Sequence, residues 1–117
     1  QAFHLPKNSE KEKDTRGQAI QDAFKGAIAP PLALMKKALS LLEFTEFTLR
    51  KGNPNAFSDA GVAFYLAGVA FNGGKMNVLI NLGSLKDVSF KVSCRNEVRQ
   101  LEERFETMKK RIEIIIR

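Results

Sequence analysis

The sequence has one cysteine and one histidine in 117 residues, and these shortages exclude several kinds of protein. With Cys94 as the single thiol, an internal disulfide framework is impossible. One cysteine and one histidine are too few for a structural zinc site, so no metal is expected. A glycine-rich phosphate loop, a nucleophile elbow and a Cys/His pair are all missing, which excludes the catalytic classes that those motifs identify.

Long apolar runs are missing as well. None reaches the length of a membrane span, and the first ten residues lack the basic segment and apolar core of a leader sequence. These observations predict a cytoplasmic protein with no membrane partner.

The composition that remains is that of one globular unit over residues 1–117, with 44% hydrophobic and 27% charged residues. The net charge of +6 favours an anionic partner. However, basic residues alternate with acidic ones, as in residues 10–16, and form no stripe with interleaved aromatic residues. A nucleic-acid partner is therefore not expected.

Helical signals dominate the first half of the chain. Ser9 and Glu12 have the spacing of a capping box, so a helix is expected to begin near Ser9. Pro30 and Pro31 are expected to end or kink this helix, which can restart at Pro31. Gly52 follows two basic residues and is a typical C-terminal helix signal.

Residues 52–74 contain a single charged residue, Asp59, and are expected to be buried. Ser58 and Asp59 are plausible first residues of a helix that runs to about Asn72, and the glycines at 73–74 are expected to interrupt it. Residues 77–82 have strand propensity, but the sequence offers no partner strand. We expect this segment to be irregular or helical.

The C-terminal third has a heptad-like pattern of apolar residues. A helix start is expected at residues 84–87, and charged residues occupy the other faces of the long helix that follows. Such a helix packs antiparallel in a bundle or across a dimer interface. The fold expected is an all-α multihelical bundle, and a homodimer is expected because the other helices are too short to cover the whole apolar seam. The seam consists of Val98, Leu101, Phe105, Met108, Ile112 and Ile115.

Polar side chains within apolar surroundings are the remaining candidates for chemistry. Asp59 is either a helix cap or a carboxylate in a pocket with a perturbed pKa, and the pattern alone favours the cap. Four asparagines flank the same segment: Asn53, Asn55, Asn77 and Asn81.

Three other residues are further candidates: His4 as a general base, Lys7 as an anion contact and Cys94 as a reactive thiol. For each of them a structural or solvent-exposed role is favoured instead.

Four strings of residues resemble a known family in order and spacing. They are Leu5-Pro6-Lys7-Asn8 with Glu12, Lys13, Asp14 and Arg16; Pro31-Leu32-Ala33-Leu34; Gly52-Asn53-Pro54-Asn55 with Ser58 and Asp59; and Asn77-Val78-Leu79-Ile80-Asn81-Leu82. The sequence resembles the formiminotransferase-cyclodeaminase family, which includes free-standing methenyltetrahydrofolate cyclohydrolases.

The resemblance implies an all-helical, dimer-forming fold that acts on one-carbon derivatives of tetrahydrofolate, without a metal. It implies that Asp59 is catalytic and that other polar residues bind the folate. These are Asn53, Ser58, Asn77, Asn81 and Lys7, with Lys75 as a further candidate for contact with the glutamate tail.

The family's domain is longer than this chain and places a glycine-rich segment and an acidic catalytic helix upstream of it. We therefore expect residues 1–117 to be the C-terminal portion of such a domain and to be inactive alone. The alternative is a non-catalytic helical interaction module whose working surface is the seam of the last helix.

Overall fold

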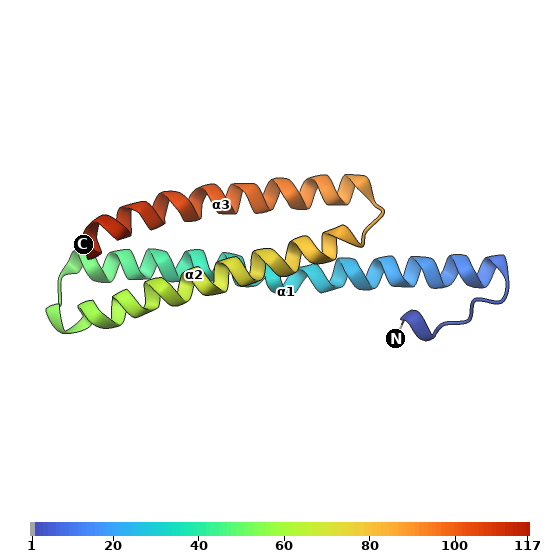
Figure 1. The fold of residues 1–117 in the computed structure, drawn as a ribbon, viewed down its shortest axis with the longest axis horizontal. Helices are drawn as coiled ribbons and strands as arrows, with labels where there is room; N and C mark the ends of the chain where they lie inside the picture. The colour runs from blue at the N-terminus through green and yellow to red at the C-terminus, as the bar shows by residue number, and fades with distance from the viewer. Residues whose placement is uncertain (1) are drawn as a thin grey trace.

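The computed structural model describes residues 2–117 and consists of three long helices (Figure 1). Helix α1 spans Glu10–Lys51, α2 spans Pro54–Gly83 and α3 spans Val88–Ile116, after a short 3-10 helix at Ala2–His4. No strand occurs within residues 2–117, which confirms the expected all-α class.

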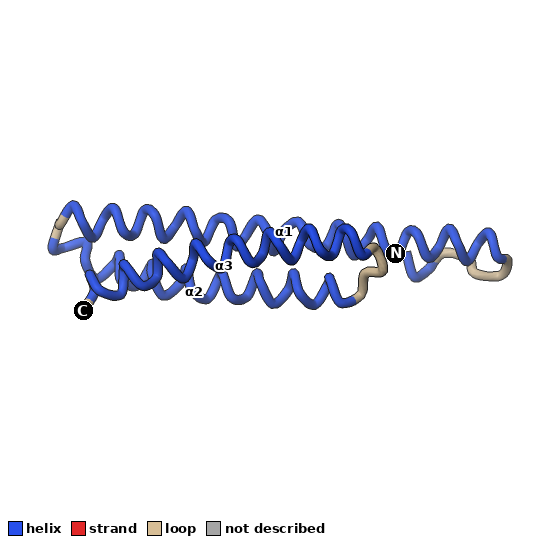
Figure 2. Tube along the Cα trace, turned by 90° about the horizontal axis from the view of Figure 1, so that it is seen from above, coloured by secondary structure: helices blue, strands red, loops and turns tan. Residues whose placement is uncertain are grey.

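The three helices run antiparallel in chain order and form an elongated bundle of 67 × 24 × 16 Å. Helix α1 contacts both of the others, and the first turns of α1 extend past the α2–α3 loop in both views (Figures 1 and 2). The C-terminus of α3 lies beside the α1–α2 turn. The bundle therefore has one end formed by that turn and another formed by the α2–α3 loop.

The ends of α1 are as expected from the sequence. The Ser9 hydroxyl accepts a hydrogen bond from the Glu12 backbone N–H at 3.1 Å, which confirms the N-terminal cap. Gly52 ends the helix with φ of 76°, in the left-handed region that glycine adopts without strain.

The prediction that the proline pair ends α1 is wrong, because the helix continues through both residues. Each proline lacks the N–H of an intrahelical hydrogen bond, which costs about 3 kcal/mol in a helix interior. Ile28 and Met35 lie on either side of the pair, and both are buried in the shared core. Their packing keeps the two halves of α1 in one helix.

Helix α2 also differs from its prediction at two points. It begins at Pro54 with Asn53 as its N-cap, not at Ser58 or Asp59, and it continues through Gly73 and Gly74. Proline is well suited to the first helical position because its missing N–H has no intrahelical partner there. The segment 77–82 is helical, in agreement with one of the two expectations for it.

Gly74 marks the closest approach of α2 to α1. A Cβ atom at this position would lie 2.7 Å from the Pro31 carbonyl oxygen and 3.0 Å from Met35 Cγ. Gly74 is buried, so no side chain fits between the two backbones. Glycine here does not break the helix but permits its packing.

The apolar seam of α3 is covered within the chain. Val98, Leu101, Phe105, Met108 and Ile112 are buried in a core shared with α1 and α2, and Ile115 packs at its edge. The Phe105 ring stacks on Phe71 of α2 with centroids 4.1 Å apart. The expectation that this seam needs a second subunit is therefore wrong. The helix start that leads into α3 is Asp87, whereas Ser84 caps the end of α2.

The apolar middle helix is not fully buried, contrary to expectation. One side of α2 packs on the core, but six large apolar side chains on the opposite side are 57–71% exposed. We call these residues the outer face of α2: Val62, Tyr65, Leu66, Val69, Met76 and Ile80. A helix that is apolar on all sides is normally covered on all sides, so this face is unpartnered in the isolated chain.

Among residues 2–117, no helix has a stretch both long and apolar enough to traverse a lipid bilayer.

The substitution Gly74→Ala should lower the free energy of unfolding by about 1–3 kcal/mol, because the new methyl group collides with the Pro31 carbonyl. Gly26→Ala is the matched control, since a Cβ at that exposed helical position meets nothing within 4 Å. It should raise stability by about 0.5–1 kcal/mol. Urea unfolding of the two variants checks this, and equal stabilities would contradict a tight crossing at Gly74.

Candidate functional site

Asp59 lies in the second turn of α2 and is solvent-exposed. It is not the helix cap, because Asn53 occupies that position and its side-chain oxygen accepts a hydrogen bond from the Asn55 N–H at 3.0 Å. The sequence pattern favoured the cap, and the structure corrects this. The carboxylate instead lines a cavity of about 360 Å³ between α1 and α2.

The walls of this cavity are largely apolar. Thr45 and Thr48 line it from α1, and their hydroxyls donate to the carbonyls of Leu41 and Phe44 at 2.7 and 2.9 Å. Asp59 is the single charged residue in the lining. The remaining lining residues are Leu41, Phe44, Ala56, Ala60 and Ala63. Asp59 is exposed beside these walls, so its negative charge can stabilise a cationic ligand bound there.

Two other predicted residues lie at the same end of the bundle. Asn53 lines an adjoining cavity of about 380 Å³ beside the α1–α2 turn, together with Gly52 and Phe57. Ser58 precedes Asp59 on α2 and is exposed. Asn53, Ser58 and Asp59 therefore lie at the same end of the bundle, and we call them the turn-end group. Asn53 and Asp59 line different cavities, and Ser58 lines neither of these two.

Asn77 and Asn81 lie far from the turn-end group. At 1.5 Å of rise per residue, they are about 27 and 33 Å from Asp59 along the helix axis. The Asn81 side-chain amide donates to the backbone carbonyl of Asn77 at 2.9 Å, one turn earlier in the same helix. We call them the loop-end pair, because the α2–α3 loop follows them.

The two candidate lysines, Lys7 and Lys75, lie in surroundings that differ from those of the asparagines and from each other. Lys7 is exposed and belongs to the segment before α1, which lies at the end of the molecule opposite the α1–α2 turn (Figure 1). Lys75 forms an ion pair and hydrogen bond with Glu102 of α3. One copy of this chain thus does not bring the predicted site residues into a single cavity.

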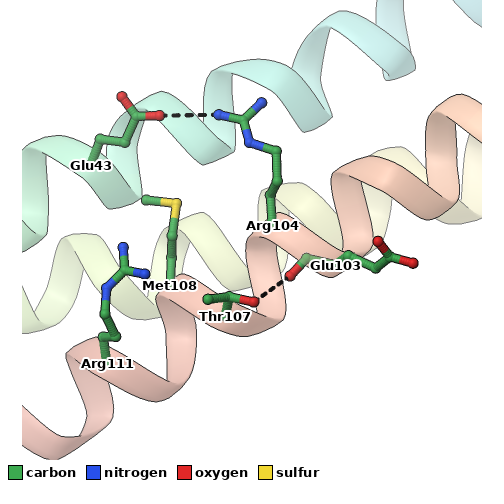
Figure 3. Close-up of a pocket in the computed structure, with 6 residues that line it drawn as sticks. All are labelled: Glu43, Glu103, Arg104, Thr107, Met108 and Arg111. Atoms are coloured by element: carbon green, nitrogen blue, oxygen red, sulfur yellow. Dashed lines mark hydrogen bonds and ion pairs between the residues drawn. The ribbon is translucent and has the colours of Figure 1, made fainter.

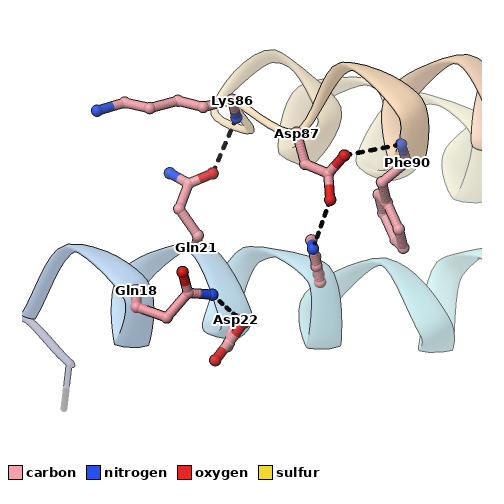
Figure 4. Close-up of polar contacts among 7 residues, drawn as sticks. Gln18, Gln21, Asp22, Lys86, Asp87 and Phe90 are labelled. Carbon is pink, nitrogen blue, oxygen red and sulfur yellow. Dashed lines mark hydrogen bonds and ion pairs between the residues drawn. The ribbon is translucent and has the colours of Figure 1, made fainter. Parts of the chain in front are cut away.

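The α2–α3 loop is held to α1 by a set of polar contacts (Figure 4). Gln21 accepts a hydrogen bond from the Lys86 N–H at 2.8 Å and donates to the Ser84 carbonyl at 3.3 Å. The Asp87 carboxylate accepts from Lys25 at 2.8 Å, which lowers the pKa of Asp87 and raises that of Lys25. These contacts fix the end of α2 that bears the loop-end pair.

A second cleft, between α1 and α3, has a volume of about 420 Å³ (Figure 3). Its arginines already have carboxylate partners. Arg104 pairs with Glu43 at 3.3 Å, and Arg111 donates two hydrogen bonds to Glu46 at 2.9 and 3.0 Å. We interpret this cleft as a structural junction between the helices. Sequence reasoning missed it, because the partners are more than sixty residues apart.

Neither His4 nor Cys94 supports a catalytic role. His4 is exposed in the short N-terminal helix. Cys94 is buried in the core, and burial raises the pKa of its thiol, with a further contribution from the charge of Glu97. Its role as a small buried apolar residue is confirmed. Among residues 2–117, no three His, Cys, Asp or Glu side chains gather in a way that could hold a metal ion.

Comparison with known proteins identifies the family. Residues 1–100 match the family described as Formiminotransferase-cyclodeaminase. This chain belongs to that family. Membership confirms the resemblance that the four residue strings indicated. The matched range includes the strings that contain Asp59 and the loop-end pair.

The names of the relatives refer to two related activities. A methenyltetrahydrofolate cyclohydrolase from Methylorubrum extorquens is 38% identical over 89 residues, which are 76% of this chain and 43% of that protein. A formimidoyltransferase-cyclodeaminase from Sus scrofa is 35% identical over 100 residues, 86% of this chain and 18% of that protein. The corresponding Rattus norvegicus protein is 34% identical with the same coverage. The chain thus spans less than half the length of these relatives.

The contact between Glu46 and Arg111 should make stability depend on pH. Hydrogen bonds from Arg111, and then from Arg50, lower the pKa of Glu46 from 4.5 to about 2, although its partial burial opposes this. The stabilisation is complete above pH 4.5 and is lost as the pH falls through about 2. Glu46→Gln should therefore cost on the order of 1–3 kcal/mol at pH 7 and much less near pH 2.

The measurement is denaturant unfolding at several pH values. Glu106→Gln serves as the control, because Glu106 is exposed. A stability difference between wild type and Glu46→Gln that stays constant from pH 7 to pH 2 would contradict the assignment.

Proposed function

We propose that this chain is part of a folate one-carbon enzyme. It either hydrolyses 5,10-methenyltetrahydrofolate to 10-formyltetrahydrofolate, or forms the methenyl compound from 5-formiminotetrahydrofolate with release of ammonia. Family membership supports the folate substrate class. The observation on which the role of this chain depends is the position of the exposed Asp59 in the lining of a largely apolar cavity between α1 and α2.

Both reactions act on one electrophilic carbon between two nitrogens. In the hydrolysis, water adds to the cationic methenyl carbon, the bond from that carbon to N5 breaks, and one proton is released. In the cyclisation, N10 attacks the carbon of the protonated formimino group and loses its own proton. The amino group on that carbon gains a proton, and its bond to the carbon breaks to release ammonia. Each reaction therefore needs a group that accepts or donates a proton. Each also needs a negative charge close to the cationic carbon.

We assign the electrostatic and proton-handling part to Asp59. Its neighbours Asn53 and Ser58 would orient the ligand at the turn end, and Asn77 and Asn81 would do so at the loop end. Lys7 and Lys75 are candidates for the glutamate tail, although Lys75 would have to share its charge with Glu102. We propose that these residues act without a metal.

We further propose that the working enzyme is a cytoplasmic homodimer in which residues 1–117 form the C-terminal portion of a longer domain. The primary acid/base carboxylate of the family pattern would then lie upstream, and the 117-residue chain alone would be inactive. The coverage of less than half of each relative supports a longer domain.

The second candidate is a non-catalytic helical interaction module. The outer face of α2 favours it, because six exposed apolar side chains form a surface suited to another protein. The seam of α3 does not favour it, since that seam is buried within the chain.

Turnover of 5,10-methenyltetrahydrofolate distinguishes the two functions. We expect an upstream-extended form to remove the near-ultraviolet absorption of this compound faster than buffer does, and the 117-residue chain to match buffer. Ammonia release from 5-formiminotetrahydrofolate separates cyclodeaminase from cyclohydrolase. Failure of both assays in the extended form would favour the interaction module.

The substitution Asp59→Asn should lower turnover of the extended form on the order of a hundredfold, the usual scale for losing one positioned acid/base or electrostatic group. The melting temperature should change little, because Asp59 is exposed and forms no cap. Asp14→Asn, on the exposed part of α1, is the matched control and should keep full activity. Full activity in Asp59→Asn would remove Asp59 from the site.

The substitution Asn81→Ala tests the loop-end pair. The Asn81 amide bonds within its own helix, to the Asn77 carbonyl, so the fold should be retained. We expect turnover to fall with little change in the circular dichroism spectrum. A folded variant with full activity would show that Asn81 does not orient substrate.

A further inference from the structure

Phe44 of α1 lines the same cavity as Asp59 of α2. Its side chain is 67% exposed, although phenylalanine is among the residue types that are most often buried. Neither of the two aromatic pairs within residues 2–117 includes this ring. An exposed aromatic ring in the lining of a cavity is a surface on which a ligand can pack.

The neighbouring Phe47 shows what such a ring binds in this chain. It lies three residues further along α1 and is 58% exposed, and the Lys51 ammonium lies 5.6 Å from the centre of its ring. The face of an aromatic ring is electron-rich and attracts a cation at this distance. The other rings with a cation over them are Phe3 and Phe90, so within residues 2–117 the Phe44 ring has none.

The cavity presents hydrogen-bond acceptors to a ligand but no available side-chain donor. Thr45 and Thr48 are the lining side chains that carry a donor, and both hydroxyls already donate to backbone carbonyls of α1, at 2.7 and 2.9 Å. The hydroxyl lone pairs, the Asp59 carboxylate and the Phe44 ring are all electron-rich. The cavity is therefore complementary to a cation and gives little to an anion or a carbonyl oxygen.

The charge of Asp59 is available to such a cation. The ion pairs within residues 2–117 all join other side chains, so no lysine or arginine of this part of the chain neutralises this carboxylate. A cation bound in the cavity would have Asp59 on α2 and the Phe44 ring on α1.

We propose that Phe44 and Asp59 form a site for a flat organic cation, and that Phe44 selects the cationic form of the one-carbon unit. The natural ligand rests on the proposed function: in the methenyl compound, a positive charge is delocalised over the N–C–N unit. In 10-formyltetrahydrofolate this charge is gone and the unit ends in a carbonyl oxygen, for which the cavity has no free side-chain donor. Phe44 thus distinguishes the substrate of the hydrolysis from its product.

The dimensions of the cavity suit a small flat ligand. Its volume of about 360 Å³ lies near the lower end of the range for small-molecule sites, about 300–1,000 Å³. Ala56, Ala60 and Ala63 line it from α2, so no long side chain of that helix has to move for a ring to enter. Asp59 directly precedes Ala60, which places the negative charge beside this wall.

Binding of two model compounds to the 117-residue chain tests the site. The cation 1,3-dimethylbenzimidazolium contains the N–C–N unit of the methenyl bridge, and 1,3-dimethylindole is a neutral compound of the same shape. Titrations followed by the NMR signals of the Ala60 and Ala63 methyl groups give an affinity for each compound. We expect both signals to shift when the cation is added.

The ratio of the two affinities, cation over neutral compound, is the decisive quantity. Phe44→Leu keeps an apolar side chain but removes the aromatic face, so it should lower this ratio about 3- to 10-fold. Phe47→Leu is the matched control, because Phe47 is exposed on the same helix but does not line this cavity, and it should leave the ratio unchanged. An unchanged ratio in Phe44→Leu, or no binding of the cation to the wild-type chain, would overturn the proposal.

Kinetics of the upstream-extended form test the selection of substrate over product. Phe44→Leu should raise the KM for 5,10-methenyltetrahydrofolate about 3- to 10-fold and change the inhibition constant of 10-formyltetrahydrofolate less than about twofold. Phe47→Leu should change neither value. Equal losses for the two compounds would show that Phe44 supplies only apolar contact, and this would overturn its role in selection.

The measurements with the model compounds use no folate, so the two proposals fail separately. Selective binding of the cation by the 117-residue chain, with no folate turnover in the extended form, would count against the proposed function alone. Folate turnover by an extended form in which Phe44→Leu leaves both the affinity ratio and the KM unchanged would overturn the cation site and leave the function standing.

Discussion

The close crossing of α1 and α2 at Pro31 and Gly74 is the contact on which the rest of the bundle depends. It brings the two backbones together where α1 has lost hydrogen bonds and α2 has no side chain. On either side of this point, the buried side chains of α1 and α2 form the surface on which α3 packs. The crossing also determines which side of α2 is left exposed, and hence where Asp59 and the two distant asparagines lie.

Much of this fold could be predicted from local signals in the sequence. Ser9 and Gly52 specify the ends of α1, and the seam of α3 is visible as a heptad-like repeat. The errors occurred where a residue's meaning depends on a distant neighbour. Pro30 and Gly73 break helices by local propensity, but tertiary packing outweighs propensity in both helices. Pairings such as Glu46 with Arg111 join residues too far apart to leave a local pattern.

The candidate site was predicted less completely than the fold. Residue type and family resemblance selected Asp59 and the asparagines as candidate site residues. The match over residues 1–100 shows the family. Sequence could not place them, because a single helix continuous from Pro54 to Gly83 keeps its two ends apart. The sequence-based prediction also overstated the burial of α2. An apolar composition does not say whether the surface that covers a helix belongs to the same chain.

The proline pair in α1 has a consequence for cooperativity. Without two amide protons, the carbonyls of Gly26 and Ala27 lack their usual partners, so the hydrogen-bond ladder of this helix is interrupted once along its length. The part of α1 before the prolines, whose first turns extend past the α2–α3 loop (Figure 1), can fray from its free end while the part after them stays folded against α2 and α3. Local unfolding that starts at Glu10 meets a natural boundary at residues 30–31, and amide exchange should show two levels of protection within one unbroken helix.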